Sequence, residues 1–489
     1  TILNIQSLQK NKDLVSVEDL LFHQGKSIGA IYCIKKIADE LGITKALGNS
    51  DNAKLALLQI AGRIICQGSR NYLANEWINN QAYQDVFKIQ NVSEDLLLDN
   101  LAWLCEKKNE IEDKIFKSSH NNTSGKTLFL YDVTSTYLEG THNELAEFGY
   151  NRDKKKGKMQ IVIGLLTDEK GYPVSIEAFK GSTNDTKTVM NQLLKLKKRF
   201  AIEKVVLVGD KGMIKSAQIR DIQSEEFQWN YITSITKEQI KTLIKKDVIQ
   251  YELFDNELVD ISDGEGTRYI LRRNPIRAKE IYTNRMSRIN WLNEFVINQN
   301  IYLDEHPRAK VETAINKVES KILKHKFSSF IKCRIIDGKI FLDVDSKQLK
   351  EQQKFDGCYA IKTDLTKEEM NTDTVHARYK DLAQVEQAFR TMKNIGENIR
   401  PVFVRKKETT IGHIFVVMLG YMIMKYMQDK LKHLPYTMKG VIESLDKIQY
   451  IKYTFGEKTK IILPDELLQQ NQEILDGLNI KLNCSLEYI

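Results

Sequence analysis

Two short apolar runs that each end in an aspartate place the strongest constraint on how this chain folds. The first run is Thr127 to Asp132, and the second starts after Lys204 and ends at Asp210. Short and nearly continuous apolar runs are typical of strands that are buried on both faces. Each predicted strand would therefore deliver one carboxylate at its end.

The segments around these runs predict a fixed order of strands and helices. The expected strands are Thr127–Asp132, Met159–Thr167, Pro173–Phe179, Val205–Gly209 and Asn230–Ile235, and the expected helices are Asp185–Phe200, capped by Asn184 or Asp185, and Ser216–Ser224. Three antiparallel strands followed by alternating helix and strand is the order of the mixed α/β, ribonuclease-H-like fold. In that fold the first and fourth strands are neighbours, so Asp132 and Asp210 would meet at one end of the sheet.

A third carboxylate lies on a segment with helical spacing. Residues Tyr379 to Lys393 contain no Gly or Pro, which predicts a single helix. At about 100° per residue, one side collects Val385, Ala388, Phe389 and Met392, and the other collects Tyr379, Glu386, Arg390 and Lys393. A solvated charged stripe is one interpretation. The other is that Glu386 joins the two aspartates around divalent cations, which prefer oxygen ligands.

At these residues the chain resembles DDE transposases of the insertion-sequence type, in the IS-four-like superfamily. The signature helix of that superfamily reads Tyr, two residues, Arg, three residues, Glu, six residues, Lys. Tyr379, Glu386 and Lys393 match it, Leu382 stands where the Arg is expected, and Arg400-Pro-Val follows as in the family. The resemblance covers roughly residues 126 to 430 and rests on three separate motifs in the right order.

The resemblance implies a two-metal phosphoryl-transfer enzyme. Such a transposase cleaves at the terminal inverted repeats of its element and joins the 3′ ends to target DNA. Asp132 would bridge two Mg²⁺ ions, with Mn²⁺ as a substitute, and Asp210 and Glu386 would each hold one of them. No covalent protein–DNA intermediate is required, in keeping with the lack of a convincing Ser or Tyr nucleophile motif.

The same reasoning nominates residues for contact with double-stranded DNA, both at the transposon ends and in the target. The candidates are Tyr379, Lys393, Arg390, Lys211, Arg152, Lys154, Lys155, Lys156, Lys158, Arg272, Arg273 and Trp291. For the loop lysines a solvated loop is the alternative, and for Trp291 it is a core position. We also hypothesise that Arg390 supplies the phosphate contact that Leu382, in place of the signature Arg, does not make. Related systems join two ends with at least two subunits, so a homodimer is expected on DNA.

Changes between helical and strand-like residue patterns along the chain predict its domain organisation. We predict a mostly helical N-terminal domain over residues 1–120, which is either a plain helical bundle or a binding domain for DNA ends. The catalytic core is expected over 121–236 and 356–430, interrupted by an inserted subdomain over 237–355. Dimerisation is one possible use of residues 431–489. In the insertion we expect strands over Val248–Phe254, Arg268–Arg272 and Phe330–Val344, and helix from about Ala278 to Lys324.

Composition narrows the class of protein. The chain has 489 residues and a net charge of +8, a modest excess that fits a nucleic-acid binder. Six scattered cysteines predict reduced thiols, and the histidines form no metal-ligand pattern. No charged-then-apolar leader opens the sequence, and its most apolar run, Ile414–Met424, is too short to cross a bilayer. We therefore expect a cytoplasmic bacterial or archaeal protein that joins the nucleoid when bound to DNA, with no membrane partner.

Three other functions remain in competition with an active transposase. A nuclease of the same fold would cut DNA and never join it. A domesticated DNA-binding protein would keep the fold and lose the chemistry, although the presence of Asp132, Asp210 and Glu386 argues against this. A helical scaffold with an incidental strand domain fits poorly with three ordered motifs.

Overall fold

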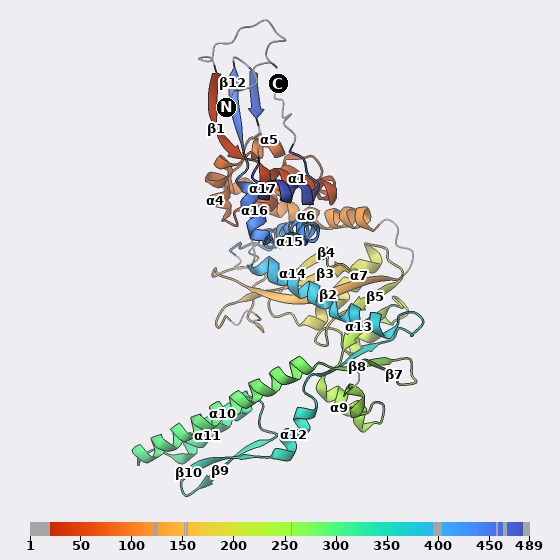
Figure 1. Cartoon of the computed structure of the whole chain (residues 1–489), viewed down its shortest axis with the longest axis vertical. Helices are drawn as coiled ribbons and strands as arrows, with labels where there is room; N and C mark the ends of the chain where they lie inside the picture. The colour runs from red at the N-terminus through yellow and green to blue at the C-terminus, as the bar shows by residue number, and fades with distance from the viewer. Residues whose placement is uncertain are drawn as a thin grey trace. The chain divides into compact units, whose positions relative to one another are not determined.

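The structure is a computed structural model of the chain (Figure 1). It describes residues 20–120, 126–150, 152, 155–255, 257–394, 403–455, 458–462 and 467–482. These residues divide into two compact units. The first consists of residues 1–229 and 380–489, and the second of residues 230–379. The finer domain boundaries drawn from the sequence stay a prediction.

The first unit is built on strands in the order β4-β3-β2-β5. Their bounds are β2 Thr127–Tyr137, β3 Gln160–Asp168, β4 Pro173–Phe179 and β5 Val205–Val208. The pairs β2/β3 and β3/β4 are antiparallel, whereas β2 and β5 are parallel. The first and fourth predicted strands are therefore neighbours, and the mixed α/β, ribonuclease-H-like fold class is confirmed.

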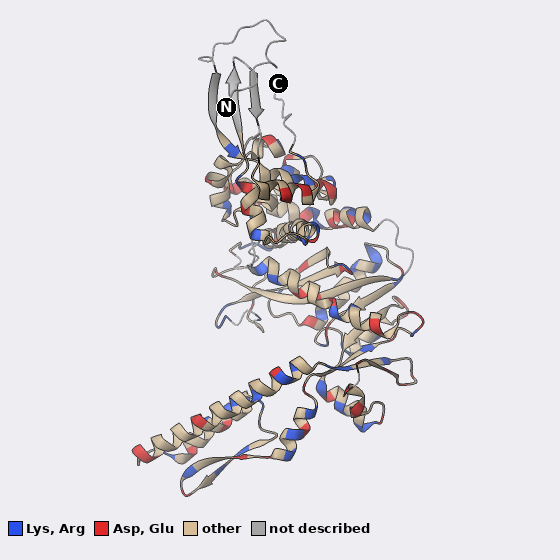
Figure 2. Cartoon of the chain, viewed as in Figure 1, with Lys and Arg blue, Asp and Glu red and all other residues tan. Residues whose placement is uncertain are grey.

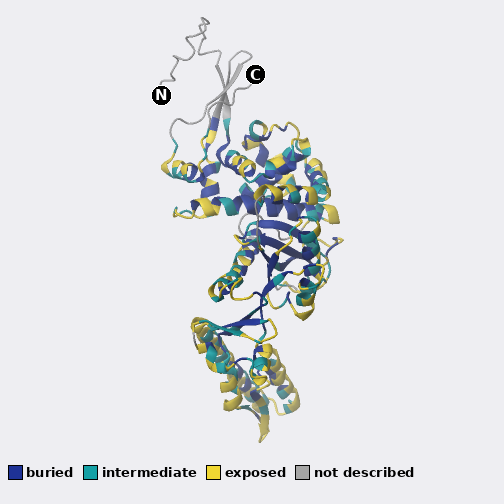
Figure 3. Ribbon diagram, turned by 90° about the vertical axis from the view of Figure 1, so that its right-hand side faces the viewer, coloured by how far each residue is buried: buried dark blue, intermediate teal, exposed yellow. Residues whose placement is uncertain are grey.

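Apolar composition explains why these strands form the centre of the unit. The first eight residues of β3 and all four residues of β5 are buried. Three helices pack against the strands: α14 (Leu382–Asn394) against β2 and β3, and α6 (Glu94–Ser119) and α15 (Lys407–Leu431) against β4. In Figure 3 the strands are accordingly coloured mostly as buried. Two further helices, α7 (Asp185–Lys198) and α8 (Ser216–Ile222), contact each other and match the predicted ones closely.

The N-terminal region is mostly helical, as predicted, and its helices share a core with the C-terminal part of the chain. Their bounds are α1 Gly29–Glu40, α2 Ile43–Leu47, α3 Asp51–Ile65, α4 Arg70–Asn75, α5 Tyr83–Phe87 and α6 Glu94–Ser119, with a short 3₁₀ helix, η3, over Trp77–Asn80. Helix α15 (Lys407–Leu431) packs against α3 and α6, and α16 (Met438–Asp446) packs against α1. Close to them are α17 (Gln469–Leu478) and a three-stranded sheet in the order β1-β12-β13, with bounds Leu20–Ser27, Gln449–Phe455 and Lys458–Ile462.

Helix α15 is more than twice as long as the apolar run noted in the sequence. By length and composition it could cross a membrane, but 89% of its most apolar window is buried inside the protein. Burial of this kind is typical of the core helix of a globular protein.

The second unit has its own strands in the order β6-β11-β8-β7. All neighbouring pairs are antiparallel, and the bounds are β6 Asn230–Ser234, β7 Val259–Ser262, β8 Arg268–Arg273 and β11 Cys358–Thr363. The strand predicted over Val248–Phe254 is wrong. That segment follows α9 (Lys237–Lys245) and overlaps the 3₁₀ helix η4 (Tyr251–Asp255). Its buried residues, Ile249 and Phe254, are five positions apart, a spacing that the two-residue alternation of a strand does not produce.

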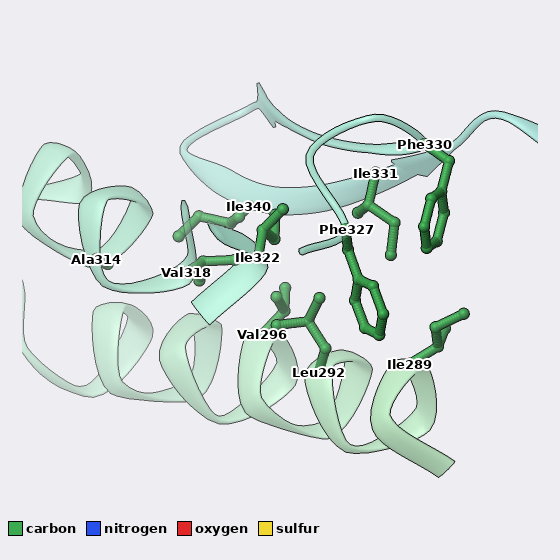
Figure 4. Close-up of a cluster of buried hydrophobic side chains, with 10 residues drawn as sticks. All are labelled: Ile289, Leu292, Val296, Ala314, Val318, Ile322, Phe327, Phe330, Ile331 and Ile340. Atoms are coloured by element: carbon green, nitrogen blue, oxygen red, sulfur yellow. The ribbon is translucent and has the colours of Figure 1, made fainter. Parts of the chain in front are cut away.

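The rest of the second unit forms a separate hydrophobic cluster, drawn in Figure 4. Its elements are α10 Pro275–Glu305, α11 Val311–Lys324, β9 Ile331–Ile336, β10 Lys339–Val344 and α12 Ser346–Lys354. Leu292 and Val296 of α10 pack with Val318 of α11, while Ile331 and Ile340 join them from the β9–β10 hairpin. The helical span expected from about Ala278 to Lys324 is therefore present as two helices, and the strand run expected over Phe330–Val344 is a hairpin of two strands.

The signature segment is two helices, not the single helix that its composition predicts. Helix α13 spans Thr372–Lys380 and α14 spans Leu382–Asn394, with Asp381 between them. The Asp381 carbonyl oxygen accepts a bond from Gln384 N at 2.8 Å, and its Oδ1 accepts one from Gln384 Nε2 at 3.2 Å. Aspartate favours such helix ends over helix interiors because its side chain competes for nearby hydrogen-bonding groups.

Candidate active site

The parallel pairing of β2 and β5 brings two of the predicted carboxylates together. The register pairs Leu130 with Val208. Asp132 and Asp210 each follow these partners by two residues, so they stand at the same end of the two strands. The Asp210 Oδ1 atom accepts hydrogen bonds from the backbone N–H groups of Gly212 (2.8 Å) and Met213 (3.0 Å). These bonds fix the carboxylate and leave its Oδ2 atom available.

Helix α14 supplies the third carboxylate. Its apolar side is buried as predicted, with Val385, Ala388 and Met392 fully enclosed and Phe389 only 5% exposed. Because α14 packs against β2 through this side, Glu386 on the other side remains exposed at the carboxylate end of the sheet.

All three carboxylates line one open cavity of about 440 Å³. Polar and charged groups dominate its lining, which consists of Asp132, Val133, Thr134, Arg152, Asp185, Asp210, Glu386, Phe389, Arg390 and Lys393. The cavity lies wholly within the first unit. The structure thus brings together the predicted carboxylates and three of the predicted cations.

The electrostatics of the cavity centre on Asp132. The pKa of Asp132 is raised to about 7, mainly by burial. The negative charges of Asp210 and Glu386 also raise it, whereas the backbone N–H of Val133 and the charge of Arg152 lower it. A carboxylate in this position needs positive charge to stay ionised at neutral pH. The cavity therefore favours cations near Asp132.

The donor set fits a hard divalent cation, because it consists of carboxylate oxygens. Asp132, Asp210 and Glu386 would be the residues that hold it. Within the described residues, however, no three His, Cys, Asp or Glu side chains lie close enough together to form a ready-made metal-binding group. The three carboxylates share a cavity without converging on a single point.

The predicted DNA contacts near the cavity have different environments. Arg390 is exposed in the cavity lining, and Lys393 Nζ donates a hydrogen bond to the backbone oxygen of Ser135 on β2 at 2.5 Å. Leu382, at the position of the signature Arg, is only 8% exposed and belongs to the apolar side of α14. A long cationic side chain at that position would have to leave the core.

The remaining predicted contacts of the first unit lie outside the cavity lining. Lys211 is exposed, Lys155 lies over the ring of Tyr137 at 5.6 Å, Lys156 is exposed, and Lys158 pairs with Glu139 at 2.7 Å. Lys154 and the Arg400-Pro-Val segment fall outside the described residues. The DNA contacts proposed for these residues stay predictions.

The other predicted contacts belong to the second unit. Tyr379 lies on α13 and is half-buried. Arg273 pairs with Asp255 at 3.1 Å, and Arg272 lies on β8 opposite Tyr359. Trp291 is 42% exposed on α10 and stacks on Phe295, with ring centroids 5.5 Å apart. Its exposure shows that it is not the core tryptophan that the sequence left as an alternative.

Asp185 is a cavity residue that the sequence reasoning did not select. It is the first residue of α7, and its carboxylate pairs with Arg152 Nη2 at 2.6 Å. The sequence offered it only as a helix cap, a common role for aspartate. The one available signal was its place at the start of the helix that connects the third and fourth predicted strands.

Comparison with known proteins identifies the family. A model described as the transposase DDE domain matches residues 123–423, which is more than half of the chain and spans β2, β5 and α14. Comparison with curated protein sequences gave no match. Among solved structures, the cryo-EM structure of the piggyBac transposase synaptic complex with hairpin DNA is similar at 10% identity and a TM-score of 0.39, over 87% of this chain and 82% of that one. By the match to the family model, the chain belongs to the family of transposases that carry the DDE domain.

Proposed function

We propose that this transposase cuts DNA at the ends of its own mobile element and joins the resulting 3′ ends to target DNA. The observation that supports this most is the cavity in which Asp132, Asp210 and Glu386 share one space with Arg390 and Lys393. Carboxylates can hold cations, and neighbouring cationic side chains can neutralise phosphates, so both requirements of phosphoryl transfer on DNA meet in one place.

Charge and position give the cavity residues different roles in this proposed reaction. Mg²⁺, or Mn²⁺ in its place, would supply Lewis-acid charge for the in-line displacement when held by Asp132, Asp210 and Glu386. Lys393, anchored on the Ser135 carbonyl, presents an ammonium group at the wall of the cavity. Arg390 lies one helical turn before it and can bind a phosphate with two parallel bonds.

The second unit adds support for DNA as the partner. It contains a cavity of about 340 Å³ whose lining includes Arg277, Arg285, Arg288, His325 and Lys326. Burial and the nearby charges of Arg288, Lys324 and Lys321 lower the pKa of His325, which reflects a positive field. Figure 2 shows Lys and Arg on α10, where they are confined to the N-terminal half, and on α12 of this unit. Such a field favours phosphates.

The test is a two-stage DNA assay. A supercoiled plasmid that carries the DNA flanking the coding sequence on both sides is incubated with the protein and Mg²⁺, Mn²⁺ or chelator. In the second stage, pre-cut end fragments are mixed with a target plasmid. We expect metal-dependent cuts at the ends, followed by fragments joined through their 3′ hydroxyls. Cuts without joined products would show a nuclease instead, and binding without cuts would show a domesticated DNA-binding protein.

A further inference from the structure

An ion pair stands in the wall of the catalytic cavity. Arg152 Nη2 lies 2.6 Å from each oxygen of the Asp185 carboxylate, and the backbone N–H of Arg152 donates to Ser135 Oγ at 3.1 Å. Both ends of Arg152 are therefore tied to the core of the first unit. One tie is to β2, the strand that carries Asp132, and the other is to the first residue of α7.

The pair faces more than the catalytic cavity. A second cavity of about 390 Å³ is also lined by Arg152 and Asp185, together with Ser182, Thr183 and Lys215. The two cavities therefore have a common part of their walls. The side chain of Arg152 therefore stands at the boundary between the two cavities.

The bonding of Arg152 leaves its remaining donors available. Only Nη2 of the side chain has a partner among the described residues, so Nε and Nη1 are unoccupied there. The side chains of Arg152 and Asp185 are 25% and 31% exposed, and ion pairs this accessible to water add little to stability. A guanidinium held in place with Nε and Nη1 unoccupied is, by contrast, well suited to donate a charge-assisted hydrogen bond to a phosphate from one of these two nitrogens.

We propose that Asp185 is a positioning residue, which holds the Arg152 guanidinium in the cavity wall so that one of its remaining donors, Nε or Nη1, binds a phosphate of the DNA strand beside the three carboxylates. The proposal rests on the proposed function, because it takes DNA as the partner of this cavity. Asp185 touches neither DNA nor metal in this account and acts only through Arg152.

The experiment is a double-mutant cycle. The variants are Asp185→Ala, Arg152→Ala and the double variant, with Asp185→Asn as a second variant that keeps the side-chain volume. The matched control is Asp51→Ala, because Asp51 is likewise the first residue of its helix, α3, and makes a surface pair with Lys54. The affinity for a duplex copied from the flanking DNA is measured at several salt concentrations, the cutting rate on the plasmid is measured with Mg²⁺, and thermal midpoints are recorded.

We expect Asp185→Ala to reproduce Arg152→Ala. Each should reduce the slope of log affinity against log salt by about 0.9, the contribution of one phosphate contact. Each should slow cutting about tenfold or more, because a displaced contact weakens the alignment of the scissile bond. In the Arg152→Ala background the Asp185 change should have no further effect, and Asp51→Ala should leave slope and rate unchanged.

Four results would overturn the proposal. An unchanged salt slope in both Asp185 variants would show that Asp185 does not position Arg152. Tighter DNA binding by them would show that Asp185 competes with phosphate. Additive losses in the double variant would show that Asp185 acts directly, for example on metal. If Asp51→Ala lowered the salt slope and the cutting rate equally, the effect of Asp185 would be one of helix stability alone. If the wild type binds DNA without cutting, the proposed function fails, but the salt slopes still decide the role of Asp185. If it binds no DNA, both ideas fail.

Discussion

At the scale of single residues, Leu382 and Arg390 show that one helix supplies both a core residue and a cavity residue. They are eight positions apart on α14, and the structure gives them opposite environments. Leu382 is packed into the core, whereas Arg390 lies exposed in the wall of the carboxylate cavity. The family signature places an Arg where Leu382 stands, so Arg390 is the residue of α14 best placed to take over its phosphate contact.

The first prediction concerns this replacement. Arg390→Ala should weaken binding to flanking DNA and reduce the slope of log affinity against log salt by about 0.9, because the variant makes one phosphate contact fewer. Gln387→Ala, on the exposed side of the same helix and outside the cavity lining, is the control and should leave the slope unchanged. Titration of labelled duplex at four salt concentrations measures both. Equal slopes for wild type and Arg390→Ala would mean that Arg390 does not replace the signature Arg.

The same residues show how far sequence reasoning reaches at this scale. Asp132 and Asp210 could be predicted because each ends a recognisable strand, and the helical period separated Glu386 from the buried side of α14. Asp185 could not be selected, because its role depends on contact with Arg152, 33 positions away. A first-turn aspartate usually serves its own helix, and no local pattern distinguishes this one.

At the scale of elements, the close approach of α15 to α6 decides how the N-terminal helices join the core. A Cβ atom at Gly412 of α15 would lie 2.0 Å from the backbone oxygen of Leu101 on α6. Only glycine allows the two helices to come this close.

The second prediction follows from this contact. Gly412→Ala should destabilise the protein by about 1–3 kcal/mol, because the two helices must move apart. Gly440→Ala on α16 is the control, since its nearest neighbour is a side-chain oxygen, Thr437 Oγ1, at 3.3 Å. Urea unfolding of both variants measures the difference. A Gly412→Ala variant as stable as the control would show that α6 and α15 are not tightly packed.

A group of buried charged side chains also connects α6 to the sheet. Lys108 of α6 lies 2.9 Å from Glu112 and 3.0 Å from Glu177 of β4, and Lys195 of α7 also pairs with Glu177. Burial alone would raise the pKa of Glu177, but the two lysines outweigh it and lower the pKa to about 2. The network therefore depends on an ionised Glu177.

The third prediction is a loss of stability in acid. The pKa of a Glu in the unfolded chain is about 4.3, higher than that of Glu177 in the folded protein. The stability that Glu177 contributes is thus fully present above about pH 4.3 and is lost as the pH falls from there towards 2. At pH 7 the free energy of unfolding of Glu177→Gln should be about 1.5–3 kcal/mol lower than that of the wild type. Between pH 5 and pH 3 the variant should lose less stability than the wild type does.

The measurement is the urea midpoint of wild type and variant at pH 7, 5 and 3. Glu110→Gln is the control, because Glu110 pairs with Lys114 at the surface of α6. Its urea midpoints should match those of the wild type at each pH. Identical acid profiles for wild type and Glu177→Gln would exclude Glu177 as the group responsible.

Sequence patterns predicted most elements, and the exceptions have physical causes. The strands of the first unit and the long helices follow apolar periodicity, which depends only on which side of an element is buried. The pairing of β1 with β12 joins residues 20–27 to 449–455, and its register depends on tertiary contacts. The break at Asp381 was missed because helix propensity outweighed the capping preference of a single residue.

At the scale of the whole molecule, DNA binding is expected to draw on both units. Each unit contains a cavity with cationic residues in its lining. Arg285 of the second unit is largely buried and uses both Nη1 and Nη2 in 2.7 Å bonds to Asp356, whereas Arg288 is exposed and has no partner among the described residues. Arg288 is therefore the better candidate for a phosphate contact.

The fourth prediction is a steep salt dependence with a measurable share from the second unit. Affinity for flanking DNA should fall sharply as salt rises, and Arg288→Ala should reduce the slope by about 0.9. Arg334→Ala on the β9–β10 hairpin is the control, because Arg334 lines neither of the two cavities. A nearly flat salt dependence of the wild type would count against both cavities as DNA-binding surfaces.

The most direct test of the account is whether Glu386 is needed for cutting. The plasmid with flanking ends is incubated with wild type, Glu386→Gln, or the exposed control Glu226→Gln, each with Mg²⁺ and with chelator. We expect wild type and control to cut at the ends in the presence of Mg²⁺. The cutting rate of Glu386→Gln should be at least about 1000-fold lower, which equals at least about 4 kcal/mol in the activation barrier. The variant should still bind DNA. Equal cutting by Glu386→Gln would contradict the account and remove Glu386 from the active site.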